Sequence, residues 1–151
     1  MQFQIKQSTI NHVTLIQLQD IEFGVTIDIL TRGALINSWL LSQRGESHQF
    51  IMGNSLHVAK EFESQGFRSA KMSPYVCRLY KGQYAHLNTN YTMDRFYMGE
   101  HAIHGIMYDA DFIVQATEAN EHQAAVILVH HYHASDKGYP FPFTMHVKWI
   151  L

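Results

Sequence analysis

The polar residues best suited to chemistry are concentrated in two short segments, residues 73–84 and 101–111, which we interpret as parts of a small-molecule site. Arg78 lies in the first segment between Cys77 and Leu79, in apolar surroundings where an unpaired charge would be costly to bury. Its planar set of donors suits paired oxygen acceptors, so its partner is either a carboxylate of the fold or the hydroxyls of a bound sugar. The residue by itself favours the carboxylate.

His104 is the candidate acid–base group of the second segment. It precedes Gly105, which allows a tight backbone turn that leaves the imidazole accessible. Imidazole titrates near neutral pH and therefore suits proton transfer. The chain contains 11 histidines, so an ordinary surface or core role is the alternative for any single one of them.

A third group of interest is the His-His-Tyr-His run at residues 130–133. On a strand, His131 and His133 share one face, and with His101 or His104 they could hold zinc or another divalent metal. The chain has no Cys-x-x-Cys, His-Glu-x-x-His or glycine-rich phosphate motif that would strengthen this interpretation. A metal-dependent β-barrel enzyme is therefore an alternative and not the main hypothesis.

Composition limits the partners and the location of the protein. The 151 residues are enough for one domain with a real core, and a net charge of −2 argues against a nucleic-acid or membrane-surface partner. The start lacks the basic-then-apolar pattern of a signal peptide and no apolar run could span a bilayer, so we expect a cytoplasmic protein. Cys77 is the only cysteine, which excludes an intrachain disulfide, and we expect it to be a buried small residue.

The elements that must position these residues are predicted to be strands, because apolar and polar residues alternate with a period of two. Strands are predicted at residues 23–29, 34–41, 48–52, 112–117, 124–133 and 143–151, and turns at 31–33, 43–46, 81–82, 119–122 and 135–140. The best candidate for a short helix is residues 55–64, where Leu56, Ala59 and Phe62 recur at spacings of three. The pattern favours an all-β sandwich or barrel.

Four motifs follow one another in a specific order along the chain. They are a Pro-Tyr-x-x-Arg block ending at Arg78, a Lys-Gly-x-Tyr turn at residues 81–84, an Ile-His-Gly motif centred on His104, and a Gly-Tyr-Pro loop at residues 135–140. Thr31-Arg32-Gly33-Ala34 also looks like an early turn into a strand. This order resembles the aldose 1-epimerase (galactose mutarotase) family, and the resemblance runs through most of the chain.

Two positions depart from the family pattern. Cys77 stands where the family commonly has asparagine, which removes an amide that could contact sugar. Ile106 stands where a second glycine is usual, which narrows the freedom of the backbone. Both departures concern the substrate more than the fold and indicate a divergent branch.

The resemblance implies a fold, a reaction and a site. The fold is a large antiparallel β-sandwich, the galactose mutarotase-like supersandwich, with residues 1–151 forming a single β domain that is its N-terminal portion. The reaction interconverts the α and β anomers of an aldose by acid/base ring opening and closure, without a cofactor or metal. Arg78 would hold a hydroxyl of the monosaccharide or related sugar, and His104 would bind near the reacting end as the catalytic residue.

The glutamate base and the second histidine of the family match no segment of this chain, and family members are considerably longer. We therefore expect the natural protein to continue past Leu151 and this chain alone to be catalytically incompetent. A partial sandwich would expose apolar faces and open edges, so we expect the chain either to self-associate or to be the ordered portion of a longer polypeptide. The missing base and the Ile106 departure leave a non-enzymatic carbohydrate-binding domain as the principal alternative.

Overall fold

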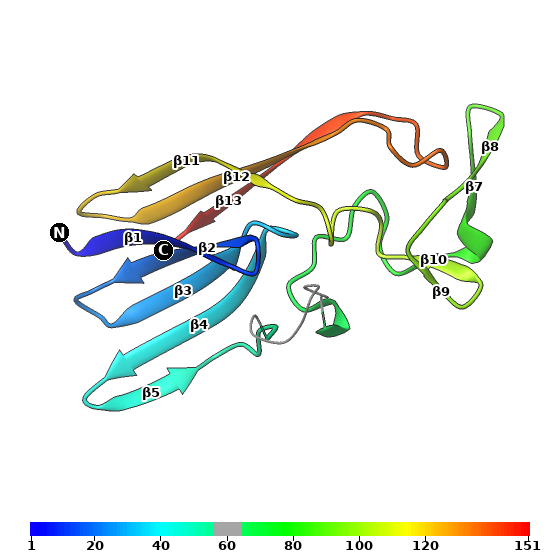
Figure 1. The fold of residues 1–151 in the computed structure, drawn as a ribbon. Helices are drawn as coiled ribbons and strands as arrows, with labels where there is room; N and C mark the ends of the chain where they lie inside the picture. The colour runs from blue at the N-terminus through cyan, green and yellow to red at the C-terminus, as the bar shows by residue number, and fades with distance from the viewer. Residues whose placement is uncertain (56–64) are drawn as a thin grey trace.

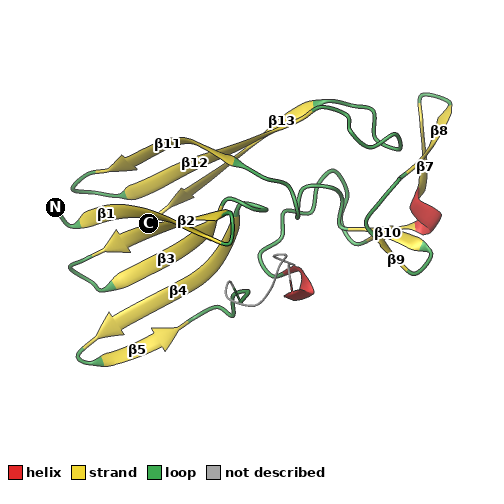
Figure 2. Ribbon diagram, in the orientation of Figure 1, coloured by secondary structure: helices red, strands yellow, loops and turns green. Residues whose placement is uncertain are grey.

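The computed structural model describes residues 1–55 and 65–151, which are mostly strands (Figures 1 and 2). The strands are β1 (Phe3–Ile10), β2 (Val13–Asp20), β3 (Val25–Leu30), β4 (Leu35–Gln43), β5 (Glu46–Gln49), β6 (Arg78–Leu79), β7 (Gln83–His86), β8 (Thr89–Thr92), β9 (Tyr97–Met98), β10 (His101–Ile103), β11 (Ile113–Ala119), β12 (Ala124–Tyr132) and β13 (Phe143–Ile150). Two 3₁₀ helices, η1 (Gln65–Phe67) and η2 (Tyr80–Gly82), accompany them. The helix predicted at residues 55–64 falls almost entirely outside the described residues.

The first layer is a five-stranded antiparallel meander in the order β1-β2-β3-β4-β5. Along β2, Ile16 and Leu18 point to one face and pair across to Ile29 and Ile27 of β3, and this face forms the main core. Strands β1 and β2 were not among the strands predicted from the pattern. Within the described residues, no helix is long and apolar enough to cross a membrane.

The second layer is the antiparallel sheet β11-β12-β13, which packs on the first (Figure 1). Val126 and Leu128 of β12 are fully buried in the shared core, and Trp149 of β13 donates its indole N–H to the carbonyl of Ala34 at 3.1 Å. The expected antiparallel β-sandwich is therefore confirmed. We call β1–β5 with β11–β13 the sandwich.

The predicted strands in the second half of the chain are confirmed within one or two residues, including the hairpin β11–β12 and the final strand β13. In the first half, β3 begins at Val25 and not at Phe23, because the Phe23 N–H donates to the Asp20 carboxylate within a turn. Strand β5 covers residues 46–49 and not 48–52. Arg44 and Gly45 both have positive φ, and this two-residue turn starts the pairing at once.

A second region, residues 65–110 and 133–141, lies beyond one end of the sandwich, and we call it the loop end (Figure 1). It contains the small sheets β6-β10-β9 and β7-β8. Its core consists of Met93, Ala102, Ile106 and Met107 together with Tyr132 from the end of β12, and further aromatic rings pack around them. Both segments singled out from the sequence fall largely within this region.

Candidate functional site

Arg78 and His104 lie on neighbouring chain segments of the loop end. Arg78 in β6 is opposite Ile103 in β10, and the N–H of His104 donates to the carbonyl of Cys77 at 2.9 Å. Backbone pairing thereby fixes these two residues, which are 26 positions apart in sequence, next to each other. The fold thus brings together the two segments that the sequence singled out.

The guanidinium of Arg78 is exposed and has no carboxylate partner in the described residues. Its Nη2 makes a weak contact with the sulfur of Met98 at 3.9 Å. The carboxylate partner favoured from the sequence is therefore absent from the described residues. Strand β6 is only two residues long and lies at the edge of its sheet, which leaves the side chain exposed. The donors of Arg78 face outward, where a ligand with paired oxygens can reach them.

The imidazole of His104 is half-buried against aromatic rings. Its ring lies edge-on to Phe67 with centroids 4.3 Å apart, and Phe67 in turn contacts Tyr108 at 5.1 Å. The Nδ1 atom of His104 is buried and has no hydrogen-bond partner among the described residues. Buried polar atoms of this kind are uncommon in folded proteins and are frequently found at functional sites. The ring is thus held in place by packing, and its Nδ1 is enclosed without a hydrogen-bond partner among the described residues.

Gly105 permits this arrangement, as the sequence predicted. It has a φ of +75°, and a Cβ built there would lie 2.0 Å from the carbonyl oxygen of Ser73. The next residue, Ile106, donates its N–H to that same carbonyl at 2.7 Å and is almost fully buried in the core of the loop end. The side chain that replaces the usual second glycine therefore fills the core and does not point toward solvent.

Cys77 does not behave as predicted. It is exposed, and its backbone adopts a positive φ of 55°, which turns its carbonyl toward the N–H of His104. The prediction of a buried small residue is wrong because the chain turns sharply at this point and no element of the described residues covers it.

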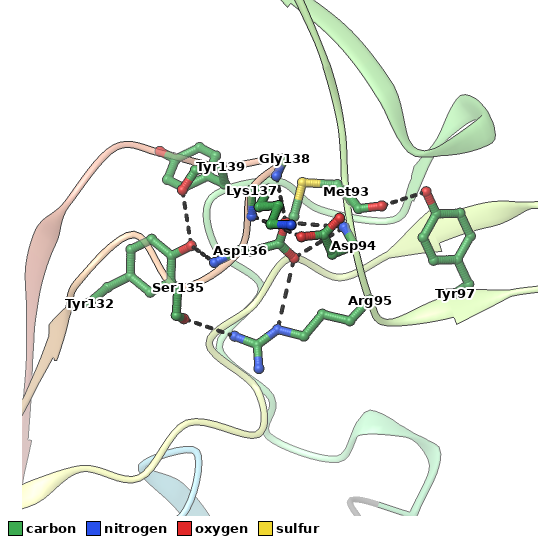
Figure 3. A network of polar contacts seen from close by, with 10 residues as sticks. All are labelled: Met93, Asp94, Arg95, Tyr97, Tyr132, Ser135, Asp136, Lys137, Gly138 and Tyr139. Atoms are coloured by element: carbon green, nitrogen blue, oxygen red, sulfur yellow. Dashed lines mark hydrogen bonds and ion pairs between the residues drawn. The ribbon is translucent and has the colours of Figure 1, made fainter.

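A buried carboxylate, Asp136, organises the polar side of the loop end (Figure 3). Its oxygens accept the N–H of Gly138 at 2.8 Å and the N–H of Asp94 at 3.1 Å, and Oδ2 lies 3.8 Å from Nε of Arg95. The carboxylate of Asp94 in turn accepts the N–H of Lys137, the residue after Asp136, at 2.9 Å. Residues 93–97 and 133–141 are therefore joined at a single buried charge.

Two tyrosines complete this network. The hydroxyl of Tyr132 accepts the N–H of Asp136 at 3.0 Å and donates to the carbonyl of Tyr139 at 2.9 Å (Figure 3). The hydroxyl of Tyr97 donates to the carbonyl of Met93 at 2.9 Å. The sequence marked the Gly-Tyr-Pro loop as a motif but did not reveal how Asp136 links it to another segment, because Asp94 and Arg95 are about 40 residues away.

A row of ring contacts leads from this network to His104. The Arg95 guanidinium lies 4.9 Å from the centroid of Phe96, Phe96 contacts Tyr108 at 4.9 Å, and Tyr108 reaches His104 through Phe67. Burial, together with the nearby Asp109 carboxylate, raises the pKa of Tyr108 to about 12. The phenol stays neutral at physiological pH and packs as an uncharged ring.

Tyr75 follows Pro74 in the first motif and belongs to the same core. Burial is the main cause that raises its pKa to about 12, and the charge of Asp136 adds to the effect. The motif tyrosine is therefore a neutral packing group near Asp136.

The histidines proposed as alternative metal ligands do not form a metal site within the described residues. His131 and His133 share a face as predicted, with ring centroids 6.4 Å apart, but Nδ1 of His131 interacts with the hydroxyl of Thr144 at 2.9 Å. His101 accepts the N–H of Lys81 at 3.1 Å. The hypothesis of a metal-dependent barrel therefore receives no support from their geometry.

Comparison with known families gives one match to a sequence model. The model described as aldose 1-epimerase matches residues 15–151. No curated protein sequence matches the chain.

Three solved structures with the same fold are distant in sequence. A galactose 1-epimerase from Lactobacillus acidophilus NCFM has a TM-score of 0.71 at 20% identity, covering 99% of this chain and 44% of its own. A galactose mutarotase-like protein from Clostridium acetobutylicum has a TM-score of 0.73 at 16% identity, and the match covers 99% of this chain and 46% of that protein. An aldose epimerase homologue from C. elegans has a TM-score of 0.64 at 17% identity, covering 84% and 38%. The chain spans less than half the length of each of these structures, and the mutarotase-like sandwich is confirmed.

Proposed function

This chain belongs to the aldose 1-epimerase family, and on that premise we propose that it holds an aldose for interconversion of its α and β anomers. The observation that carries the proposal is the pairing of β6 with β10. It fixes the backbone of Arg78, whose side chain is exposed, next to that of His104, whose buried Nδ1 has no protein partner among the described residues. An arginine and a histidine in this arrangement can bind sugar oxygens and transfer a proton.

The proposed reaction is acid–base chemistry on the sugar ring. A base removes the proton of the anomeric hydroxyl while an acid protonates the ring oxygen, and the bond between the anomeric carbon and that oxygen breaks. The aldehyde end rotates, and the reverse steps close the ring on the other face. On closure the ring oxygen returns its proton to the acid and the base returns its proton to the anomeric oxygen, so no further reactant is consumed.

Each residue has one role in this proposal. Arg78 donates to a sugar hydroxyl and fixes the orientation of the ring. His104, held by Phe67 and Gly105, binds near the ring oxygen and supplies the proton that this oxygen gains. No carboxylate pairs with Arg78 or hydrogen-bonds to His104 in the described residues, so the base is unassigned.

Binding can be tested separately from catalysis. Methyl glycosides of galactose and glucose cannot change anomer, so changes in backbone amide shifts on titration report binding alone. We expect the shifts to concentrate at residues 78 and 101–105 and the affinity to fall about tenfold or more in Arg78→Ala, with Arg44→Ala in the β4–β5 turn as the matched control. Unchanged affinity in Arg78→Ala would contradict the assignment.

Catalysis is tested by polarimetry of a fresh α-anomer solution. We expect the 151-residue chain alone to give no rate above buffer, because no base is assigned among the described residues. Acetate, added as a small external base, should restore a protein-dependent rate that disappears in His104→Gln. A protein-dependent rate without acetate would contradict the prediction that the chain alone is catalytically incompetent. Sugar binding with no acetate effect would favour the alternative, a carbohydrate-binding domain, which the unassigned base also suggests.

A further inference from the structure

A cavity of about 400 Å³ lies on the hairpin of β7 and β8, outside the Arg78–His104 site. It is lined by Tyr80, Gln83, Tyr84, Asn90, Tyr91 and Thr92. Its size lies within the range of small-molecule pockets, roughly 300–1,000 Å³. The hairpin projects from the loop end, away from the sandwich (Figure 1).

The hairpin is anchored by one of its two faces. Tyr84 and Tyr91 are opposite each other and stack with centroids 5.2 Å apart, and the Tyr84 hydroxyl donates to the carbonyl of Gly138 at 2.6 Å. Tyr91 also packs against Phe141 at 5.4 Å. These contacts hold the frame of the cavity in place before any ligand arrives, which lowers the cost of binding.

The other face carries polar side chains without protein partners. Strand alternation and the pairing of Gln83 with Thr92 place these two residues and Asn90 on the face opposite the stacked tyrosines. All three are exposed, and their side chains form no hydrogen bond with the described part of the chain. Amide and hydroxyl groups both donate and accept, which matches the alternating donors and acceptors of sugar hydroxyls.

Tyr80 supplies an aromatic surface beside these groups. Its side chain remains 69% exposed even though the Lys81 ammonium lies 5.5 Å from its ring centroid. None of the six lining residues is charged, so a neutral ligand is favoured over an anion. Exposed aromatic and uncharged polar groups together suit a sugar ring, which has an apolar face and a polar edge.

The cavity adjoins Arg78 through a short series of contacts. The Tyr80 ring lies 5.3 Å from the ring of His101, His101 is opposite Met98 across β9 and β10, and Met98 contacts the Arg78 guanidinium. Tyr80 is also only two residues after Arg78 in the chain. A ligand bound at Arg78 can therefore extend over this surface into the hairpin cavity.

We propose that the β7–β8 cavity is a second carbohydrate subsite, which takes a neutral sugar unit joined to the one held at Arg78. The ligand of this protein is then a disaccharide or a longer glycan. The inference rests on the proposed sugar site at Arg78 for the first unit, whereas the chemistry of the cavity is independent of it.

The test compares sugars of two lengths on the whole chain. Amide-shift titrations are run with methyl glycosides of galactose and glucose and with methyl lactoside, maltoside and cellobioside. We expect at least one disaccharide to bind about tenfold more tightly than either monosaccharide, with shifts at residues 80–92 that the monosaccharides do not cause. Equal affinities without shifts at the hairpin would overturn the inference and leave the proposed function standing.

Variants locate the gain in affinity. Asn90→Ala and Tyr80→Leu change exposed side chains and should reduce the ratio of disaccharide to monosaccharide affinity toward one. Thr89→Ala, on the same strand but outside the cavity, is the control and should keep the ratio. An unchanged ratio in both cavity variants contradicts the subsite. A further outcome is that no monosaccharide binds and that the disaccharide still shifts the hairpin amides in Arg78→Ala. This outcome would support the cavity as a sugar site and contradict the proposed site at Arg78.

Discussion

The sandwich and the loop end are stabilised by different kinds of interaction. The sandwich core consists mainly of buried aliphatic side chains, such as Ile16, Leu18 and Leu128, packed between two sheets. The loop end has short strands and relies on aromatic contacts and on the buried charge of Asp136. Aliphatic packing tolerates small shifts of its surroundings, whereas hydrogen bonds to one carboxylate require specific positions.

Backbone strain shows the same division. Among the described residues, 13 that are not glycine have positive φ, and nine of them lie in the loop end. They include Cys77 and His104 on either side of the candidate site. Such conformations are costly and persist only where surrounding contacts enforce them. We infer that the core of the sandwich supplies most of the free energy of folding. This free energy offsets the cost of the strained backbone that holds functional groups in place in the loop end.

The largest effect is expected from the sandwich core. Leu18→Ala removes a fully buried side chain that packs between the sheets and should lower the free energy of unfolding by about 3 kcal/mol. Urea unfolding followed by circular dichroism measures the change. Leu87→Ala, at an 84% exposed position, is the control and should change stability by less than about 0.5 kcal/mol. A similar loss in both variants would refute the proposed division.

The next effect separates stability from function in the loop end. Asp136→Asn keeps the shape but replaces a charged acceptor of two N–H groups, and should cost about 2 kcal/mol. It should also weaken sugar binding, because residues 93–97 support the rings around His104. Glu121→Gln, exposed in the β11–β12 turn, is the control for loss of charge. Normal sugar binding in Asp136→Asn would show that the network does not position the site.

A smaller effect depends on pH. The pKa of Tyr84 is raised to about 12 by burial and by neighbouring tyrosines and Asp136. Between the unfolded pKa of about 10 and the folded value, the folded state keeps a proton that the unfolded state loses, so stability falls as pH rises. Tyr84→Phe lacks this contribution.

This variant also loses the hydrogen bond to Gly138 and should be about 1 kcal/mol less stable at pH 8. The deficit should shrink at pH 11, because only the wild type is weakened by ionisation of this phenol. Urea midpoints at both pH values measure the change. A deficit that stays constant or grows would contradict the direction of the pKa shift.

The smallest effect concerns the junction between the two regions. Arg32 in the turn after β3 forms an ion pair with Asp109, with Nη2 and Oδ1 2.6 Å apart, and both side chains are about one-third exposed. Solvent screens such a pair, so Arg32→Lys should cost only about 0.5 kcal/mol. A double-mutant cycle with Asp109→Asn isolates the coupling. A coupling above about 2 kcal/mol would mean that the ion pair carries much of the junction.

The success of the sequence predictions follows the same division in part, although β1 and β2 of the sandwich were not predicted. In the sandwich, alternation located β11, β12 and β13 and the turns between them, because the period of two is a local consequence of burying one face. The predicted position of β5 was wrong because the limits of this strand depend on the turn at Arg44 and Gly45. In the loop end, strands of two to four residues are too short to show a period.

What the sequence determined by itself is the all-β class, the order of the motifs and the family that this order resembles. It also singled out Arg78, His104 and Gly105, since their residue types and spacing are local properties. Only the tertiary structure decided that Arg78 and Cys77 are exposed, that Nδ1 of His104 is buried without a partner among the described residues, and that Asp136 joins two distant loops. The physical reason is that burial and hydrogen bonding depend on residues brought together from far along the chain, which no local pattern records.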